Sequence, residues 1–233
     1  MNIRLATAFA MATLSASAAF AADLPSKTQA APAPAPVVEE FNPWMLRIRA
    51  LAFVPQSSAN LYAAGTPIDG TLKVTNTVVP EIDISYFFTK NFAVEAICCV
   101  VPAKINAKGA VAALGNVGEV IAFPPTVTLQ YHFTDLGAFK PYVGVGVNYT
   151  HFFKNGNGAN FANLKVDDSW GVAGQIGFDY MIDKHWAFNV DVKKIYMQPN
   201  AQVNLVTASG NVPLVAKTKI DPWLFGVGVG YKF

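Results

Sequence analysis

The sequence has few charged residues and, beyond its first 22 residues, no long apolar run. Asp, Glu, Lys and Arg make up 14% of the 233 residues, whereas 52% are hydrophobic. No later run reaches the ~18 apolar residues that a membrane-spanning helix needs, which argues against a helical membrane protein. The formal net charge is +2, so there is no large excess of positive charge. We therefore do not expect nucleic acid as a partner.

Cysteine is also scarce, because the chain has only Cys98 and Cys99. Neighbouring residues of a strand point to opposite faces, so these two thiols cannot form an ordinary disulfide. Their spacing matches no metal-ligand pattern either. We expect both to act as small apolar side chains, and we predict neither a cofactor nor a metal site.

The front of the chain has the features of an export signal. A basic start at residues 1–4 precedes an apolar run over 5–22, and small residues at 19 and 21 provide a cleavage site. Residues 1–21 are therefore predicted to be a signal peptide that directs the protein to a Gram-negative envelope. Residues 22–40, with an Ala-Pro alternation at 31–36, are expected to form a Pro/Ala-rich periplasmic linker. One domain remains, over residues 41–233.

Eight segments of this domain alternate between an apolar face and a smaller or more polar face, as strands do. In the last segment, every second residue from Trp223 to Phe233 is apolar or aromatic, and the positions between are mostly glycine. These glycines would leave room in the interior of a barrel. The predicted strands are 44–56, 79–88, 92–102, 124–133, 140–153, 168–182, 186–198 and 217–233.

The connections between these segments alternate between long and short. The stretches 57–75, 103–123, 154–166 and 199–216 are predicted to be long loops, whereas short turns join the other strands. Long outer loops and short periplasmic turns are typical of an outer-membrane barrel, and aromatic residues near the strand ends fit its interfacial girdles. We therefore predict an all-β, eight-stranded antiparallel up-and-down transmembrane β-barrel. The alternative is a soluble barrel around an apolar cavity, whose glycine-rich outer face would be poorly solvated.

Four long stretches resemble the OmpW family of outer-membrane proteins. They are PPTVTLQYHF (124–133), FKPYVGVGVNYTHFF (139–153), DDSWGVAGQIGFDYMI (167–182) and DPWLFGVGVGYKF (221–233). The resemblance implies a narrow, largely apolar lumen that helps small hydrophobic molecules cross the outer membrane, with lateral exit into the bilayer. It also implies that Tyr231 and Phe233 form the C-terminal signal recognised by the barrel-assembly machinery.

Candidate site residues lie on the faces predicted to point inward. Leu51 and Phe53, with Ile97 and Ile195 at positions that match the family's constriction, are expected to form an apolar lumen or gate; the simpler alternative is that they only plug the barrel. The family can have Trp at the seventh-strand position, where this chain has Ile195. A structural network of ion pairs is expected from the inward-facing charges, since unpaired charges in a narrow lumen are costly. These residues are Arg47, Arg49, Glu81, Asp83, Glu95, Asp179, Asp191, Lys193 and Lys232.

The predicted barrel could serve one of three functions. The preferred one is a conduit or binding protein for small hydrophobic solutes in the outer membrane. The alternative is a structural or surface-receptor barrel whose extracellular loops bind an external partner. An enzyme is not expected, because His132, His151 and His185 lie on different segments without an adjacent nucleophile or acid in a known motif.

The membrane-barrel prediction can be tested with the purified protein. We expect it to need detergent for solubility and to migrate differently in detergent gels before and after heating, because a closed barrel resists unfolding at room temperature. A protein that stays soluble without detergent would contradict the prediction.

Overall fold

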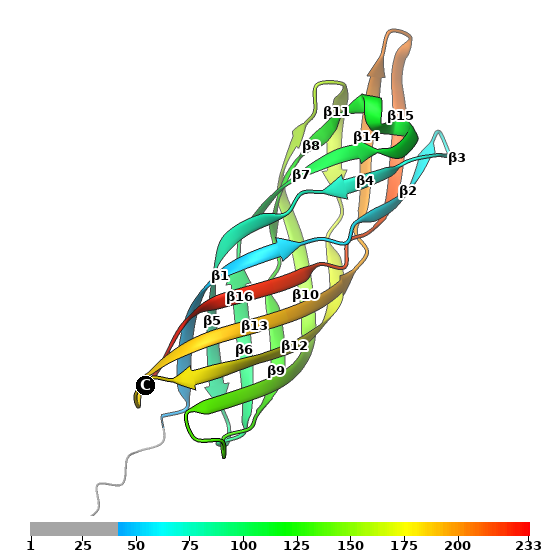
Figure 1. Ribbon diagram of the computed structural model, residues 1–233. Helices are drawn as coiled ribbons and strands as arrows, with labels where there is room; N and C mark the ends of the chain where they lie inside the picture. The colour runs from blue at the N-terminus through cyan, green and yellow to red at the C-terminus, as the bar shows by residue number, and fades with distance from the viewer. Residues whose placement is uncertain (1–41) are drawn as a thin grey trace, which may run out of the picture. The chain divides into compact units, whose positions relative to one another are not determined.

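The computed structural model describes residues 42–233, which form mostly antiparallel strands (Figure 1). The predicted signal peptide and the whole of the predicted linker lie outside these residues. A short 3-10 helix, η1 (Gly109–Leu114), also lies in this part of the chain. Within residues 42–233, no helix is long and apolar enough to cross a membrane.

Eight strands form a closed barrel in which each strand pairs with its neighbours along the barrel sequence. The last strand pairs with the first, and β10 pairs with β12 to complete the ring. The predicted eight-stranded up-and-down barrel is therefore confirmed. Its strands are β1 (Trp44–Val54), β5 (Thr77–Phe87), β6 (Phe92–Cys99), β9 (Thr126–His132), β10 (Phe139–Asn157), β12 (Ser169–Met181), β13 (Trp186–Met197) and β16 (Trp223–Lys232).

In strand β16, apolar side chains that face outward alternate with residues, mostly glycine, that face the lumen. Phe225, Val227 and Val229 lie on the outside, each about half exposed. On the inside, a Cβ added at Gly226 would lie 3.1 Å from Cδ of Arg49, and one at Gly230 would lie 2.7 Å from Cε of Met45. The expected room beside these glycines is thus not empty. The side chains of β1 already fill that space, and at Gly228, between these two positions, an added Cβ would meet the backbone of Ile48 and Arg49.

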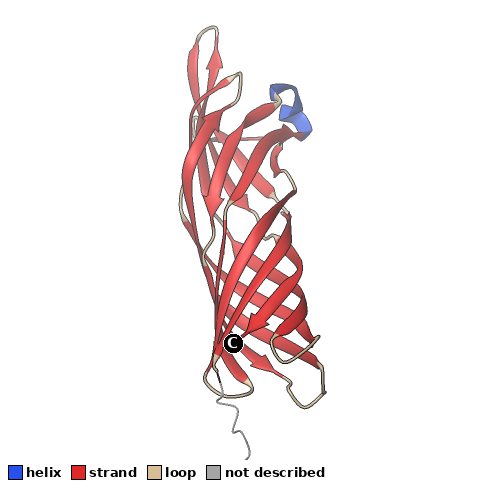
Figure 2. Cartoon of the chain, turned by 90° about the vertical axis from the view of Figure 1, so that its left-hand side faces the viewer, coloured by secondary structure: helices blue, strands red, loops and turns tan. Residues whose placement is uncertain are grey.

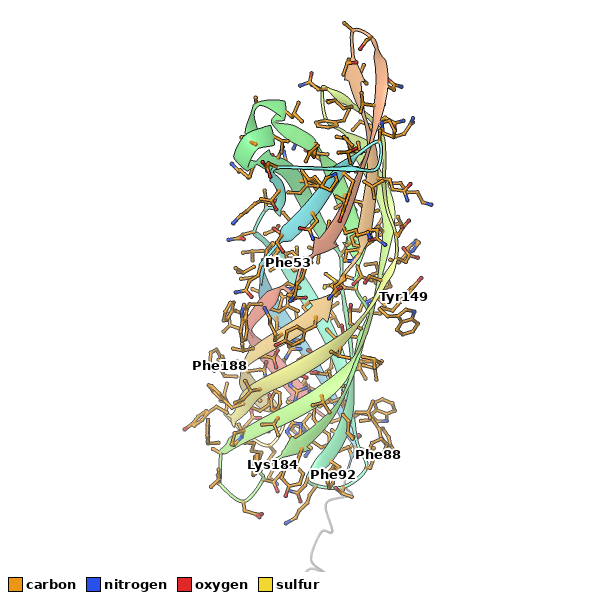
Figure 3. The ribbon with its side chains drawn as sticks, turned by 90° about the vertical axis from the view of Figure 1, so that its right-hand side faces the viewer. Phe53, Phe88, Phe92, Tyr149, Lys184 and Phe188 are labelled. Carbon is orange, nitrogen blue, oxygen red and sulfur yellow. The ribbon has the colours of Figure 1, made fainter. Side chains whose placement is uncertain are left out.

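Aromatic side chains ring both ends of the barrel. Near the short turns, Tyr86 lies between Trp44 and Phe88, with ring centres 4.8 and 5.4 Å apart. At the opposite end, the rings of Tyr149 and Trp170 are 4.9 Å apart. Figure 3 shows Phe88 near the lower end of the barrel and Tyr149 well above it. Between the two rings the outer surface is apolar, as a barrel facing lipid requires.

The prediction that the four long connections are loops is wrong. They form further strands that continue the barrel strands upward into an extension, which also carries η1 (Figures 1 and 2). Ala103, Ile105 and Ala107, for example, alternate with exposed residues and point inward. The glycines and small residues of these stretches masked that alternation. The added strands are β2 (Ser58–Ala63), β3 (Thr66–Ile68), β4 (Thr71–Val74), β7 (Val101–Lys108), β8 (Asn116–Phe123), β11 (Phe161–Val166), β14 (Asn200–Thr207) and β15 (Gly210–Lys219).

The extension consists of two sheets around a shared apolar core. One sheet is the outer part of β10 with β8, β7 and β4, and the other is β11, β14, β15, β2 and β3. Their inner faces meet in a cluster that includes Leu72, Val117, Phe161, Leu164 and Val203. In the described residues no backbone ladder joins β2 to β4. Side chains bridge this seam instead: the amide of Ala59 donates to Thr71 Oγ1 and that of Val74 to Ser57 Oγ, both at 2.9 Å.

The core of the extension can be tested at Phe161, which is 5% exposed. Replacing a buried Phe with Ala removes about 3–5 kcal/mol of packing. We expect Phe161→Ala to speed amide hydrogen exchange in β11 and β14 and to leave the barrel strands protected. Phe153→Ala is the matched control, since Phe153 is 52% exposed. Equal exchange in the two variants would contradict this account of the core.

Candidate functional site

Arg47 is the centre of a polar network inside the barrel. Its Nε and Nη2 donate to the two carboxylate oxygens of Asp179 at 3.0 and 2.7 Å. Its Nη1 donates to Ser85 Oγ at 2.7 Å, to Asp83 at 3.2 Å and to Glu95 at 3.3 Å. The guanidinium therefore joins strands on opposite sides of the lumen. Such bidentate, charge-assisted bonds are among the strongest that side chains form.

Arg49, two residues along β1, extends the network toward the outer end. Its Nε donates to Glu81 at 2.7 Å, and its Nη2 lies 2.6 Å from Asp83 Oδ2. Lys193 then contacts Glu81 at 3.0 Å and Asp191 at 2.5 Å. All of these groups are at most 2% exposed. Water therefore does not reach them, and their charges are balanced only by one another and by neutral donors.

Neutral side chains complete the network, because three cations (Arg47, Arg49 and Lys193) face five carboxyl groups. The hydroxyl of Tyr142 donates to Asp191 at 2.8 Å, and Gln175 Nε2 donates to Asp191 at 2.7 Å and to Glu95 at 2.8 Å. Gln130 Nε2 adds a bond to Glu95 at 2.7 Å. The alternation placed these residues on the inner face, but it gave no reason to single out uncharged side chains as network members.

The periplasmic side of the network is closed by apolar side chains. Met45, Phe87, Ala93 and Ala187 are buried there together. Lys232, which was predicted to join the polar network, is half-buried with its Nζ 5.1 Å from the centre of the Phe87 ring. The barrel interior is thus filled at two successive levels.

Directly above the network lies an apolar cavity that contains all four predicted gate residues. Leu51, Phe53, Ile97 and Ile195 line it together, and it has a volume of about 20 Å³. Glu81 and Lys193 form part of its lining, so its lower boundary is the polar network. Figure 3 shows Phe53 at this level, where the barrel passes into the extension.

Two further apolar cavities continue upward through the extension. The first, of about 60 Å³, shares Phe53, Val101 and Met197 with the cavity below. The second, of about 30 Å³, shares Leu72 and Ile105 with the first. We call these three cavities the apolar chamber. The polar side chains lining its two upper cavities are Ser57, Ser58, Thr150 and Thr218. The sequence prediction missed these upper cavities because their strands had been assigned to loops.

The three histidines lie in three different parts of the structure. His132 is buried in the lumen beside Gln130, and His185 lies in a turn. At the outer rim, Asp168 accepts hydrogen bonds from His151 at 2.8 Å and Tyr149 at 2.7 Å, and these bonds lower the pKa of its carboxyl to about 2. Within residues 42–233, no three His, Cys, Asp or Glu side chains are placed to hold a metal ion.

Because the polar network is buried, we expect it to contribute to the free energy of unfolding. Arg47→Ala leaves Asp179, Asp83 and Glu95 without their main partner, so we expect a loss of about 3–5 kcal/mol in the free energy of unfolding. The measurement is urea unfolding of the refolded barrel in lipid vesicles. Lys90→Ala is the control, because the Lys90–Asp135 pair is mostly exposed and such pairs contribute about 1 kcal/mol or less. Similar unfolding midpoints would show that the network adds little.

Comparisons with known proteins agree with the geometry. The OmpW family model matches residues 43–233. An uncharacterized outer-membrane protein, y4mB, of Sinorhizobium fredii is 44% identical over 227 residues, which cover 97% of this chain and 95% of the relative. Outer membrane protein W of Vibrio cholerae is 35% identical over 188 residues, covering 73% of this chain and 85% of the relative. The crystal structure of OprG from Pseudomonas aeruginosa aligns with a TM-score of 0.77 and 30% identity, covering 82% of this chain and 95% of that one. The chain therefore belongs to the OmpW family and lies in the outer membrane of a Gram-negative bacterium.

Proposed function

We propose that this barrel takes up small, uncharged, apolar molecules from outside the cell and delivers them into the outer membrane. The observation that carries the proposal is the apolar chamber, a row of three small neighbouring cavities that leads through the extension and ends above the polar network. Its apolar side chains would move apart to admit a solute. Since short turns of such barrels face the periplasm, the extension lies on the extracellular side. An apolar solute would exchange water for apolar side chains on entering it.

The lining of the chamber favours solutes without charge. Glu81 and Lys193, the charged residues in its floor, already pair with each other at 3.0 Å. A charged solute would lose its hydration and find no free counterion there, which is costly in an apolar site. Leu51, Phe53, Ile97 and Ile195 would then act as the floor on which the solute rests, in place of a gate into the lumen.

Because the lumen is closed, exit of the solute through the wall fits the structure better than passage through the lumen into the periplasm. Below the floor, buried charges and then buried apolar side chains fill the barrel. In the wall, Ser57, Ser58, Leu72 and Val74 line the chamber at the seam between β2 and β4. Because hydroxyl groups replace a backbone ladder at this seam, its strands separate at a lower cost than paired strands do. This supports the lateral route that the family resemblance implies.

The end of β16 supports a role in assembly. Tyr231 packs against Trp186 and Phe233, with ring centres 5.0 Å apart in both pairs. Phe233 is 53% exposed on the outer surface. We propose that these exposed aromatic side chains present the signal to the barrel-assembly machinery.

The conduit can be tested by filling the chamber. Ala122 and Ala201 both line its first upper cavity and are buried. We expect Ala122→Phe and Ala201→Phe to slow entry of the neutral dye N-phenyl-1-naphthylamine into intact cells, roughly to the rate of cells lacking the protein. The dye fluoresces when it reaches the membrane interior, so its fluorescence rise gives the rate directly.

Ala96→Phe is the matched control, because Ala96 lies on the exposed outer face of β6. Heat-modifiable migration verifies that each variant folds and is present in equal amount. If folded, chamber-filled variants admit the dye as fast as the native protein, the chamber is not the route.

A further inference from the structure

We propose that the outer face of β2, β14 and β15, together with Lys194, binds the phosphorylated headgroup of the glycolipid that forms the outer leaflet, lipopolysaccharide. This surface lies at the base of the extension, where the strands leave the apolar belt of the barrel (Figure 1). The proposal concerns the outside of the wall and is independent of the apolar chamber inside it.

Two lysines form the middle of this surface, on the central strand of the three. Lys217 lies opposite Asn200 on one side and Asn60 on the other. Lys219 lies opposite Ser58. All five side chains are exposed and on the same face of the sheet. The surface thus offers two ammonium groups with hydroxyl and amide groups beside them, which suits phosphates attached to a sugar.

Lys194 adds a third cation at the lower edge of the surface. Its Nζ donates to the carbonyl of Asp221 at 2.6 Å and to Gln56 Oε1 at 2.7 Å. It also lies 4.8 Å from the centre of the Trp223 ring and 5.7 Å from that of Tyr196. These contacts hold the ammonium immediately above the interfacial aromatic residues, the level at which lipid headgroups begin.

The charge of this surface is positive and has little to neutralise it. Strands β2, β14 and β15 contain no Asp or Glu. The carboxylate paired with Lys219 is Asp221, which is 5% exposed; it lies 3.3 Å from Lys219 and also accepts a bond from the amide of Met197 at 3.1 Å. At the edge beside Asn200, Asp167 is paired with Lys165 at 3.7 Å, so these two charges cancel. Three lysines and one aspartate leave a net charge of +2. A cluster of lysines beside a membrane surface attracts anionic headgroups.

The barrel surface below provides room for the acyl chains of the same lipid. Trp223, Phe225 and Val227 of β16 are 36%, 47% and 46% exposed and form an apolar strip directly under Lys194. A single glycolipid would place its acyl chains on this strip and its phosphates among the three lysines. Lipids of the inner leaflet reach only the opposite end of the barrel.

The test uses full-length protein purified in detergent and freed of bound lipid. Native mass spectrometry measures binding of lipid A carrying both phosphates, of the same lipid A without phosphates, and of phosphatidylglycerol. We expect preferential binding of the phosphorylated lipid A. The triple variant Lys194→Gln, Lys217→Gln and Lys219→Gln should weaken it on the order of tenfold or more.

The control is Lys73→Gln, Lys104→Gln and Lys108→Gln, which removes the same charge from exposed positions on the other sheet. It should bind phosphorylated lipid A as the native protein does, and heat-modifiable migration verifies that both triple variants fold. Equal loss in the two variants, equal binding of dephosphorylated lipid A, or equal binding of phosphatidylglycerol would each overturn the proposal.

Discussion

The ladder between β10 and β12 is the constraint on which the rest of the structure depends. It runs from the pair of Phe139 with Tyr180 to the pair of Thr150 with Ser169 and closes the sheet into a ring. In hydrocarbon no water is available for backbone groups, so an open edge would leave each unpaired group at a cost of several kcal/mol. Closure with eight strands, however, makes a narrow interior. Gly228 is therefore required where β16 lies against the backbone of β1, and Gly226 and Gly230 make room for the side chains of β1.

The closed barrel also explains the form of the polar network. Arg47 and Arg49 cannot reach water from the narrow interior, so their charges must be paired by carboxylates from several strands. The result is a cross-linked, dry layer that seals the barrel. The proposed route for apolar solutes therefore uses the apolar chamber above this layer.

The backbone pairing of the strands changes at the level where the chain leaves the lipid. Prolines stand at these transitions, including Pro55, Pro124, Pro125, Pro199 and Pro222, and a proline cannot donate to a ladder. Above them the wall divides into two sheets whose seam between β2 and β4 is bridged by Ser57 and Thr71. Such an incomplete wall is tolerated at the edge of the hydrocarbon, where water reaches the free backbone groups. The seam, the chamber and the lysine surface all occur at this same level.

The sequence by itself determined the barrel, its strand order and the face on which each side chain of the eight strands lies, because alternation in a strand is a local property of the backbone. It also placed Arg47, Glu81 and Lys193 on the inside. Only the tertiary structure decided which of these charges meet, because the paired residues lie far apart in the chain. Arg49 and Glu81 are 32 residues apart, and Lys193 and Glu81 are 112 residues apart. The extension was not predicted, because its short strands are stable only when the two sheets pack around Phe161 and Leu164. The two upper cavities of the apolar chamber depend on that packing and therefore could not be predicted from the sequence, whereas the side chains lining the lowest one could.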